Sequence, residues 1–156
     1  MILSKSGKVL VANRGPGVRV ARFIDPDLRD QLYNHGEIEQ TSLFQDLQAS
    51  ALTYFADGEM LILNLSMLEH FPTVLYSCFL RVREIVMGHR GVVVLCGIRP
   101  ETKEILDLFK AERLFVVTKT EAQALRLAGA MGRSLSADEN AEGPSPFEVF
   151  DRRRPR

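Results

Sequence analysis

The chain has 156 residues, of which 46% are hydrophobic and 26% are charged, and this composition is typical of an ordinary globular protein. Twenty Lys and Arg residues balance twenty Asp and Glu residues, so the chain lacks the cationic surplus needed to coat nucleic acid or an anionic membrane. No apolar run approaches the roughly 20 residues of a membrane span, and no signal peptide is evident. We therefore expect a cytoplasmic protein with no direct contact to nucleic acid or membrane.

The first third of the chain predicts a hairpin and a helix. Two strand-like runs, residues 8–13 and 17–23, flank the turn residues Arg14-Gly15-Pro16. Residues 27–36 are polar and predict an irregular link. Apolar residues at helical spacing predict a helix over residues 37–56, ended by Asp57-Gly58.

The middle of the chain alternates apolar runs of strand length with amphipathic helical segments. The predicted strands are residues 60–65, 92–96 and 114–117, and the first two are expected near the centre of the sheet. The predicted helices are residues 72–87, 101–110 and 121–130, with Pro72 in the first turn of one and Thr120 as the N-cap of another. The order β-β-α-β-α-β-α-β-α predicts an α/β fold in which an N-terminal hairpin is followed by parallel β-α units.

After Gly132 the composition shifts to Ser, Gly, Pro and charged residues. We therefore predict one domain over residues 1–132 and a flexible charged tail over residues 133–156. The stretch Phe147-Glu148-Val149-Phe150 within this tail is apolar enough to dock on the domain, although an unstructured tail is the simpler interpretation.

Short catalytic and ligand-binding motifs are missing from the sequence. It contains no GxGxxG, no GxxxxGK[ST] and no GxSxG motif, and its three histidines are far apart. Cys78 and Cys96 lie in apolar runs, which predicts buried free thiols rather than a disulfide or a metal site. We predict a protein without a cofactor, a metal or catalytic residues, and so not an enzyme.

Residues 8–130 resemble a STAS domain, the fold of bacterial anti-sigma factor antagonists. The resemblance implies a central mixed sheet with helices packed mainly on one side. The segments that carry it are residues 20–26 (VARFIDP), 61–66 (LILNLS), 79–83 (FLRVR), 91–101 (GVVVLCGIRPE), 114–115 (LF) and 120–125 (TEAQAL).

The resemblance also implies a phosphorylation site. In this family an Asp-Ser-Ser-Gly-like motif begins the helix after the strand, and a partner serine kinase phosphorylates its first serine, which breaks the complex with the anti-sigma factor. Spacing from Asn64 places Pro72-Thr73-Val74-Leu75 at this motif, so Thr73 is the candidate phosphoacceptor. Pro72 replaces the acidic residue, and Val74 and Leu75 replace small ones. The alternative is that the Thr73 hydroxyl only caps the first turn of the helix.

The partner implied by the resemblance is an anti-sigma factor or a serine/threonine kinase-like regulatory protein, and a homodimer stays open. The expected partner-binding residues surround the start of the helix: Ser66, Glu69, His70, Phe71, Pro72, Thr73 and Tyr76. Two other functions remain open. One is a STAS scaffold or oligomer subunit that does not switch. The other is a small α/β enzyme or ligand-binding protein that uses Asn64, Glu69, His70 and Thr73 at the strand ends.

Overall fold

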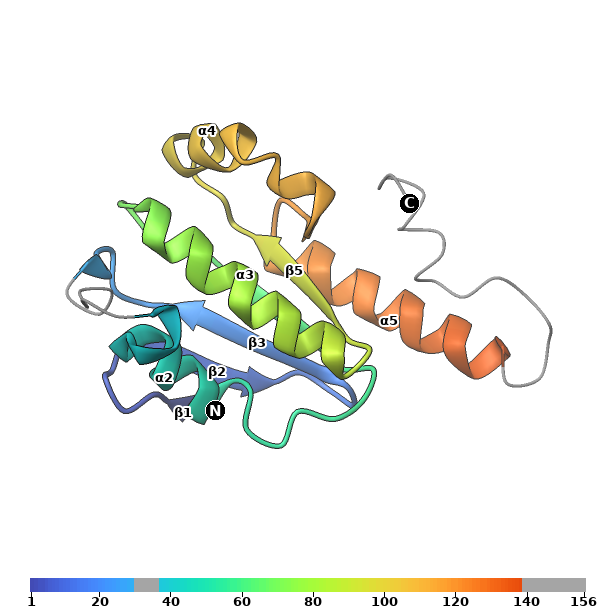
Figure 1. Cartoon of the computed structure of the whole chain (residues 1–156). Helices are drawn as coiled ribbons and strands as arrows, with labels where there is room; N and C mark the ends of the chain where they lie inside the picture. The colour runs from blue at the N-terminus through green and yellow to red at the C-terminus, as the bar shows by residue number, and fades with distance from the viewer. Residues whose placement is uncertain (30–36, 139–156) are drawn as a thin grey trace.

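The computed structural model describes residues 1–29 and 37–138, and its centre is a mixed sheet with strand order β1-β2-β3-β4-β5-β6 (Figure 1). Strands β1 to β3 pair antiparallel, and β3 to β6 pair parallel. The hairpin and the inner position of the two long apolar strands are therefore confirmed. The strands are β1 (Ile2–Leu3), β2 (Val9–Asn13), β3 (Val18–Phe23), β4 (Met60–Asn64), β5 (Val92–Cys96) and β6 (Val116–Val117).

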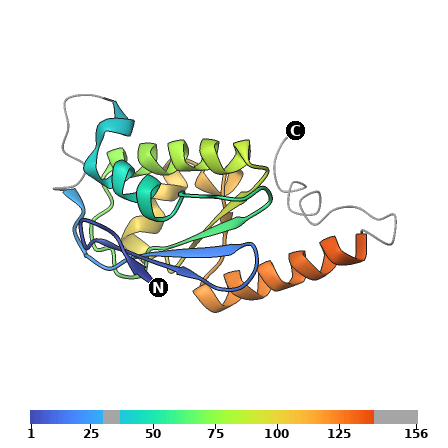
Figure 2. The ribbon, with the colours of Figure 1, turned by 90° about the horizontal axis from the view of Figure 1, so that it is seen from below.

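Helices cover both faces of this sheet, but unequally. Figure 2 shows α2 and α3 on one face and α5 alone on the other. This confirms the expected packing of helices mainly on one side. The helices are α2 (Ser42–Ser50), α3 (Thr73–Gly88), α4 (Pro100–Leu108) and α5 (Glu121–Asp138), with short 3₁₀ turns η1 (Ile38–Gln40) and η2 (Ala111–Arg113).

Strand β4 shows why an uninterrupted apolar run forms an inner strand. Its side chains alternate between the two faces of the sheet. Leu61 and Leu63 are fully buried in the larger core beneath α2 and α3, whereas Met60 and Ile62 pack in the smaller core beneath α5. Since both faces are covered, every residue of the run can be apolar.

The helix expected over residues 37–56 is shorter than predicted. It begins late because Thr41 is the N-cap of α2, and its hydroxyl accepts the Phe44 N–H at 3.2 Å. Beyond the end of α2, the Arg19 guanidinium from β3 donates to the carbonyls of Ala51 (3.0 Å), Thr53 (2.5 Å) and Tyr54 (2.6 Å). These carbonyls therefore bond to a side chain of the sheet, and the chain leaves the helix.

Other boundaries differ by a few residues. Strand β1 was not predicted, Pro72 is the N-cap of α3 rather than a first-turn residue, and β6 has only two residues. Helix α5 continues to Asp138, beyond the predicted end of the domain at Gly132. The rest of the predicted tail, residues 139–156, and most of the predicted link, residues 30–36, lie outside the described residues. Within the described part of the chain, no helix is long and apolar enough to cross a membrane.

Candidate functional site

The loop between β4 and α3 leads to the candidate site, and buried anchors hold it in place. Leu65, Leu68 and Phe71 are at most 5% exposed and point into the core. The N–H groups of Glu69 and His70 donate to the carbonyl of Pro26, at 3.0 and 3.3 Å. The exposed side chains of this loop are thus mounted on a fixed backbone.

A polar network joins this loop to two other parts of the sheet. Asn64 Oδ1 accepts the Ser66 N–H at 3.0 Å, and Asn64 Nδ2 donates to Glu121 Oε1 at 3.0 Å. Arg22 Nε donates to the same carboxylate at 2.7 Å. The hydrogen bond from Arg22, reinforced by that from Asn64, lowers the pKa of Glu121 despite its partial burial. Both ends of the Asn64 amide are used, so this side chain is structural.

Strand β5 fixes the start of the same loop from the other side. Gly97 has φ +68°, and a Cβ on it would lie 2.8 Å from Asn64 Oδ1 and 3.0 Å from Ser66 N. Arg99 Nε donates to the Ser66 carbonyl at 3.0 Å. The close approach requires a glycine here, because only glycine adopts this conformation without strain and leaves the space empty.

Thr73 is the first residue of α3, and its side chain is exposed. The N-cap is Pro72, with φ −70° and ψ 154°, and it forms no side-chain capping bond. No hydrogen bond links the Thr73 hydroxyl to another described residue, in contrast to Thr120, whose hydroxyl accepts the Gln123 N–H at 3.1 Å. The Thr73 hydroxyl therefore does not cap the helix and points to solvent.

The predicted partner-binding residues divide into exposed and buried groups. Phe71 and Tyr76 are 5% and 4% exposed, and Tyr76 stacks on Phe109 with ring centroids 4.6 Å apart. These two side chains therefore support the surface from beneath. Pro72 is half-buried. The exposed members are Ser66, Glu69, His70 and Thr73.

Two exposed apolar residues at this surface were missed by the sequence interpretation. Met67 is 51% exposed and Val74 is 40% exposed. A signal existed for Val74, because it lies outside the buried stripe of α3 that begins with Leu75 and Phe79. We call the exposed residues Ser66, Met67, Glu69, His70, Thr73 and Val74 the α3 surface.

Comparisons with known proteins find relatives by structure but not by sequence. No family model matches the chain, and no curated protein matches it. An anti-sigma-factor antagonist (STAS) domain protein from Planctomyces limnophilus aligns with a TM-score of 0.52 at 18% identity, over 75% of this chain and 93% of that one. A candidate anti-sigma factor antagonist from Thermotoga maritima aligns in its crystal structure with a TM-score of 0.60 at 10% identity, over 76% and 92%. The NMR structure of that second protein aligns with a TM-score of 0.55 at 15% identity, over 73% and 83%.

The chain has the fold of a STAS domain. The N-terminal hairpin, the parallel β-α units and the mixed sheet are thus those of its structural neighbours. In this STAS fold the α3 surface follows the carboxyl end of β4, and a hollow of about 330 Å³ lies beside it. Glu69 and His70 line this hollow together with Glu101 and the buried Thr102 of α4.

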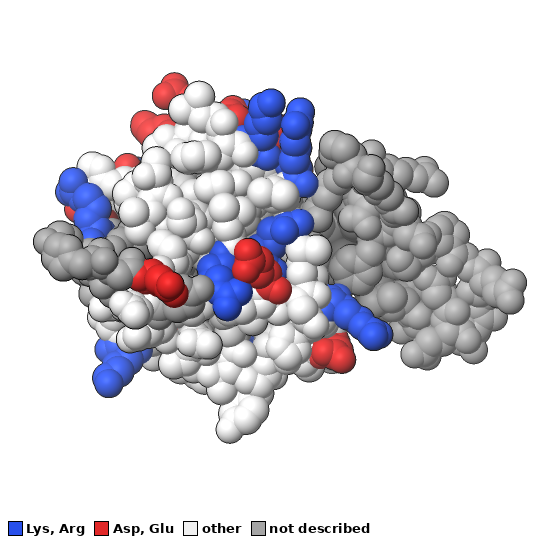
Figure 3. All heavy atoms as spheres, viewed as in Figure 1, with Lys and Arg blue, Asp and Glu red and all other residues white. Residues whose placement is uncertain are grey.

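The charge of the domain is dispersed on the face that carries α3. Figure 3 shows Lys and Arg interspersed with Asp and Glu, with broad uncharged areas between them. Among the described residues, no three His, Cys, Asp or Glu side chains form a cluster that could hold a metal ion. The α3 surface therefore offers hydroxyl groups, apolar side chains and the ionisable side chains of Glu69 and His70.

Proposed function

We propose that the chain is a STAS-type interaction module that binds an anti-sigma factor or a related serine/threonine kinase-like regulator in the cytoplasm. The α3 surface is the binding site. One observation carries the proposal: the segment that holds Thr73, whose hydroxyl has no hydrogen bond to another described residue, also exposes the apolar side chains of Met67 and Val74. A partner that packs apolar side chains against Met67 and Val74 would take them out of water, as the core of a protein interface does.

Phosphorylation of Thr73 would act on this surface in a simple way. A phosphate adds about two negative charges and needs either cations or water around it. The start of α3 offers free backbone N–H groups to it, so the isolated domain tolerates the modification. A partner packed over Met67 and Val74 would instead have to bury this charge away from water. Phosphorylation should therefore release the partner.

We infer that the protein acts by binding rather than by catalysis. The amide of Asn64, one of the residues considered for an enzyme, is committed to Ser66 and Glu121. Glu69 and His70 line the hollow beside α4, and neither forms a side-chain hydrogen bond to another described residue. Neither Glu69 nor His70 is therefore held in place by a second described side chain, as catalytic bases usually are.

The experiment separates a switching module from a scaffold that does not switch. The full chain is incubated with ATP and each candidate kinase-like regulator of its host, and phosphate is mapped by mass spectrometry. We expect one phosphate on Thr73 and none in Thr73→Ala. Thr120→Ala is the matched control, because Thr120 also begins a helix but its hydroxyl is engaged. Binding of a regulator without modification of Thr73 would favour the scaffold, and modification only at another residue would contradict the assignment of Thr73.

A further inference from the structure

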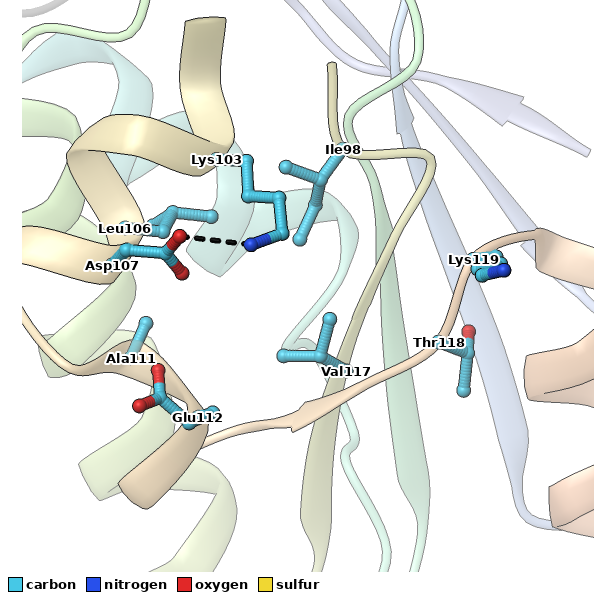
Figure 4. Close-up of a pocket in the computed structure, with 9 residues that line it drawn as sticks. All are labelled: Ile98, Lys103, Leu106, Asp107, Ala111, Glu112, Val117, Thr118 and Lys119. Carbon is cyan, nitrogen blue, oxygen red and sulfur yellow. Dashed lines mark hydrogen bonds and ion pairs between the residues drawn. The ribbon is translucent and has the colours of Figure 1, made fainter. Parts of the chain in front are cut away.

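A second surface lies at the opposite edge of the domain from β1, between α4 and β6. It is a groove of about 560 Å³, shown in Figure 4. Ile98, Leu106, Ala111 and Val117 form its apolar lining. A groove of this size and lining fits one or two large apolar side chains from another segment.

The edge of β6 is open along this groove. β6 is the last strand of the described sheet, and the Thr118 N–H donates inward to the Leu95 carbonyl at 2.9 Å. Successive backbone amides alternate in direction, so the N–H and C=O of Val117 point away from β5. Val117 is 40% exposed. An unpaired strand edge beside an apolar groove is a template for an added strand.

The charges around the groove give the added strand a direction. Glu112 lies at one end of the groove and Lys119 at the other, as Figure 4 shows. Neither forms an ion pair with another described residue, whereas Lys103 and Asp107 on the α4 rim pair with each other at 2.8 Å. The groove therefore favours a segment whose acidic end meets Lys119 and whose basic end meets Glu112.

We propose that this groove binds the chain's own C-terminal segment, residues 147–154, as a strand antiparallel to β6. The sequence of the segment is Phe-Glu-Val-Phe-Asp-Arg-Arg-Arg, with its acidic residues before its arginines. In an extended strand Phe147 and Val149 share one face, and Phe150 lies on the other. Phe147 and Val149 enter the groove near Lys119, and the arginines follow toward Glu112.

The length of chain between the domain and this segment permits the contact. Helix α5 has 18 residues, so its end lies about 27 Å from its start at 1.5 Å per residue. Its first residue, Glu121, follows the groove residue Lys119 closely in the chain. The eight residues 139–146 span up to about 26–29 Å when extended, which returns Phe147 to the start of α5. The segment then enters the groove from the Lys119 end, in the direction that the charges favour.

A cysteine at the open edge reports whether the groove is occupied. In the full chain carrying Val117→Cys, the native thiols of Cys78 and Cys96 stay silent, because both are buried and burial raises the pKa of each to about 12. The rate of alkylation by N-ethylmaleimide is compared with and without the additional change Phe147→Ser/Val149→Ser. Met87→Cys, at a residue 46% exposed at the far end of α3, serves as the accessibility control.

We expect the tail substitutions to speed alkylation at position 117 about tenfold or more, as they open a protected site. Phe150→Ser alone should leave the site protected, and the rate at position 87 should not change. Equal alkylation rates at position 117 with the native tail and with the Phe147→Ser/Val149→Ser tail would overturn the proposal. Protection that disappears on hundredfold dilution would also overturn it, since the groove would then hold the tail of a second copy.

Discussion

Replacing Gly97 with alanine should loosen the anchor of the loop that carries the α3 surface. Gly97 has φ +68°, and an added Cβ would lie 2.8 Å from Asn64 Oδ1, 2.9 Å from Ser66 Cβ and 3.0 Å from Ser66 N. Two of these atoms belong to Ser66, whose N–H is bound to Asn64. The loop must therefore shift, and the hydrogen bond between Ser66 and Asn64 should weaken.

The loss of folding stability in Gly97→Ala has two parts, backbone strain and overpacking, and the same substitution at a second glycine separates them. The left-handed conformation costs an alanine roughly 1–2 kcal/mol. Overpacking against fixed atoms adds about 1–3 kcal/mol. Gly58 has φ +80° with nothing within 4 Å of an added Cβ, so Gly58→Ala bears only the first part. Alanine also restricts the unfolded chain, which returns about 0.4–1 kcal/mol in both variants. We expect losses of about 1–4.5 kcal/mol for Gly97→Ala and about 0–1.5 kcal/mol for Gly58→Ala.

Urea unfolding followed by far-UV circular dichroism measures the difference, since the chain has no Trp to report by fluorescence. With a slope of about 2 kcal/mol per molar urea, the midpoint should fall by about 0.5–2 M for Gly97→Ala and by less for Gly58→Ala. Hydrogen exchange should also quicken at the Ser66 amide in this variant alone. Equal midpoints for the two variants would refute the close approach of β5 to the loop.

Three further predictions test the interior and the network. The lowered pKa of Glu121 means that its carboxylate stabilises the fold above its ordinary pKa of 4.5 and stops doing so as pH falls through the folded-state value. Glu121→Gln should therefore lower the free energy of unfolding by about 1.5–3 kcal/mol at neutral pH. This loss should shrink as pH falls below 4.5, and a loss that does not change with pH in urea titrations would contradict the reasoning. Tyr76→Phe should raise the free energy of unfolding by about 1 kcal/mol, because the buried hydroxyl has no partner among the described residues, and a clear loss would reveal one. Cys78 and Cys96, with pKa values raised to about 12, should not react with Ellman's reagent in the folded protein and should both react in urea; reaction at neutral pH without urea would show that the core opens.

The sequence predicted the inner strands well because their signal is local. An uninterrupted run such as Val92–Cys96 is apolar at every position only when both faces of a strand are covered. The early end of α2 could not be predicted, because Arg19 from a distant strand donates to the carbonyls of residues 51, 53 and 54. Strand β6 is short for a similar reason. The N–H groups of Leu114 and Phe115 donate to the carbonyl of Ala111 in η2, so these two residues end the turn and do not join the strand.

The candidate site was only partly visible in the sequence. Spacing from Asn64 located Thr73 at the helix start, but it did not show that Pro72 takes the N-cap position and leaves the Thr73 hydroxyl free. Tyr76 was predicted to be available for binding, but Phe109 at the end of α4 stacks on its ring and helps to bury it. This contact joins two separate elements, so the local sequence around Tyr76 does not reveal it. The network of Arg22, Asn64 and Glu121 joins residues up to 99 positions apart, so no local pattern reveals it.

The most direct test of the proposed function is the affinity of the full chain for a kinase-like regulator of its host, measured by isothermal titration calorimetry. Val74→Asp places a charge on the α3 surface, and Leu108→Asp makes the same kind of change at a residue 81% exposed on α4. We predict that Val74→Asp weakens binding at least about tenfold, as expected for a charge buried in an apolar contact, and that Leu108→Asp leaves it unchanged. Equal affinities for the wild-type chain and Val74→Asp would contradict the assignment of the α3 surface as the binding site.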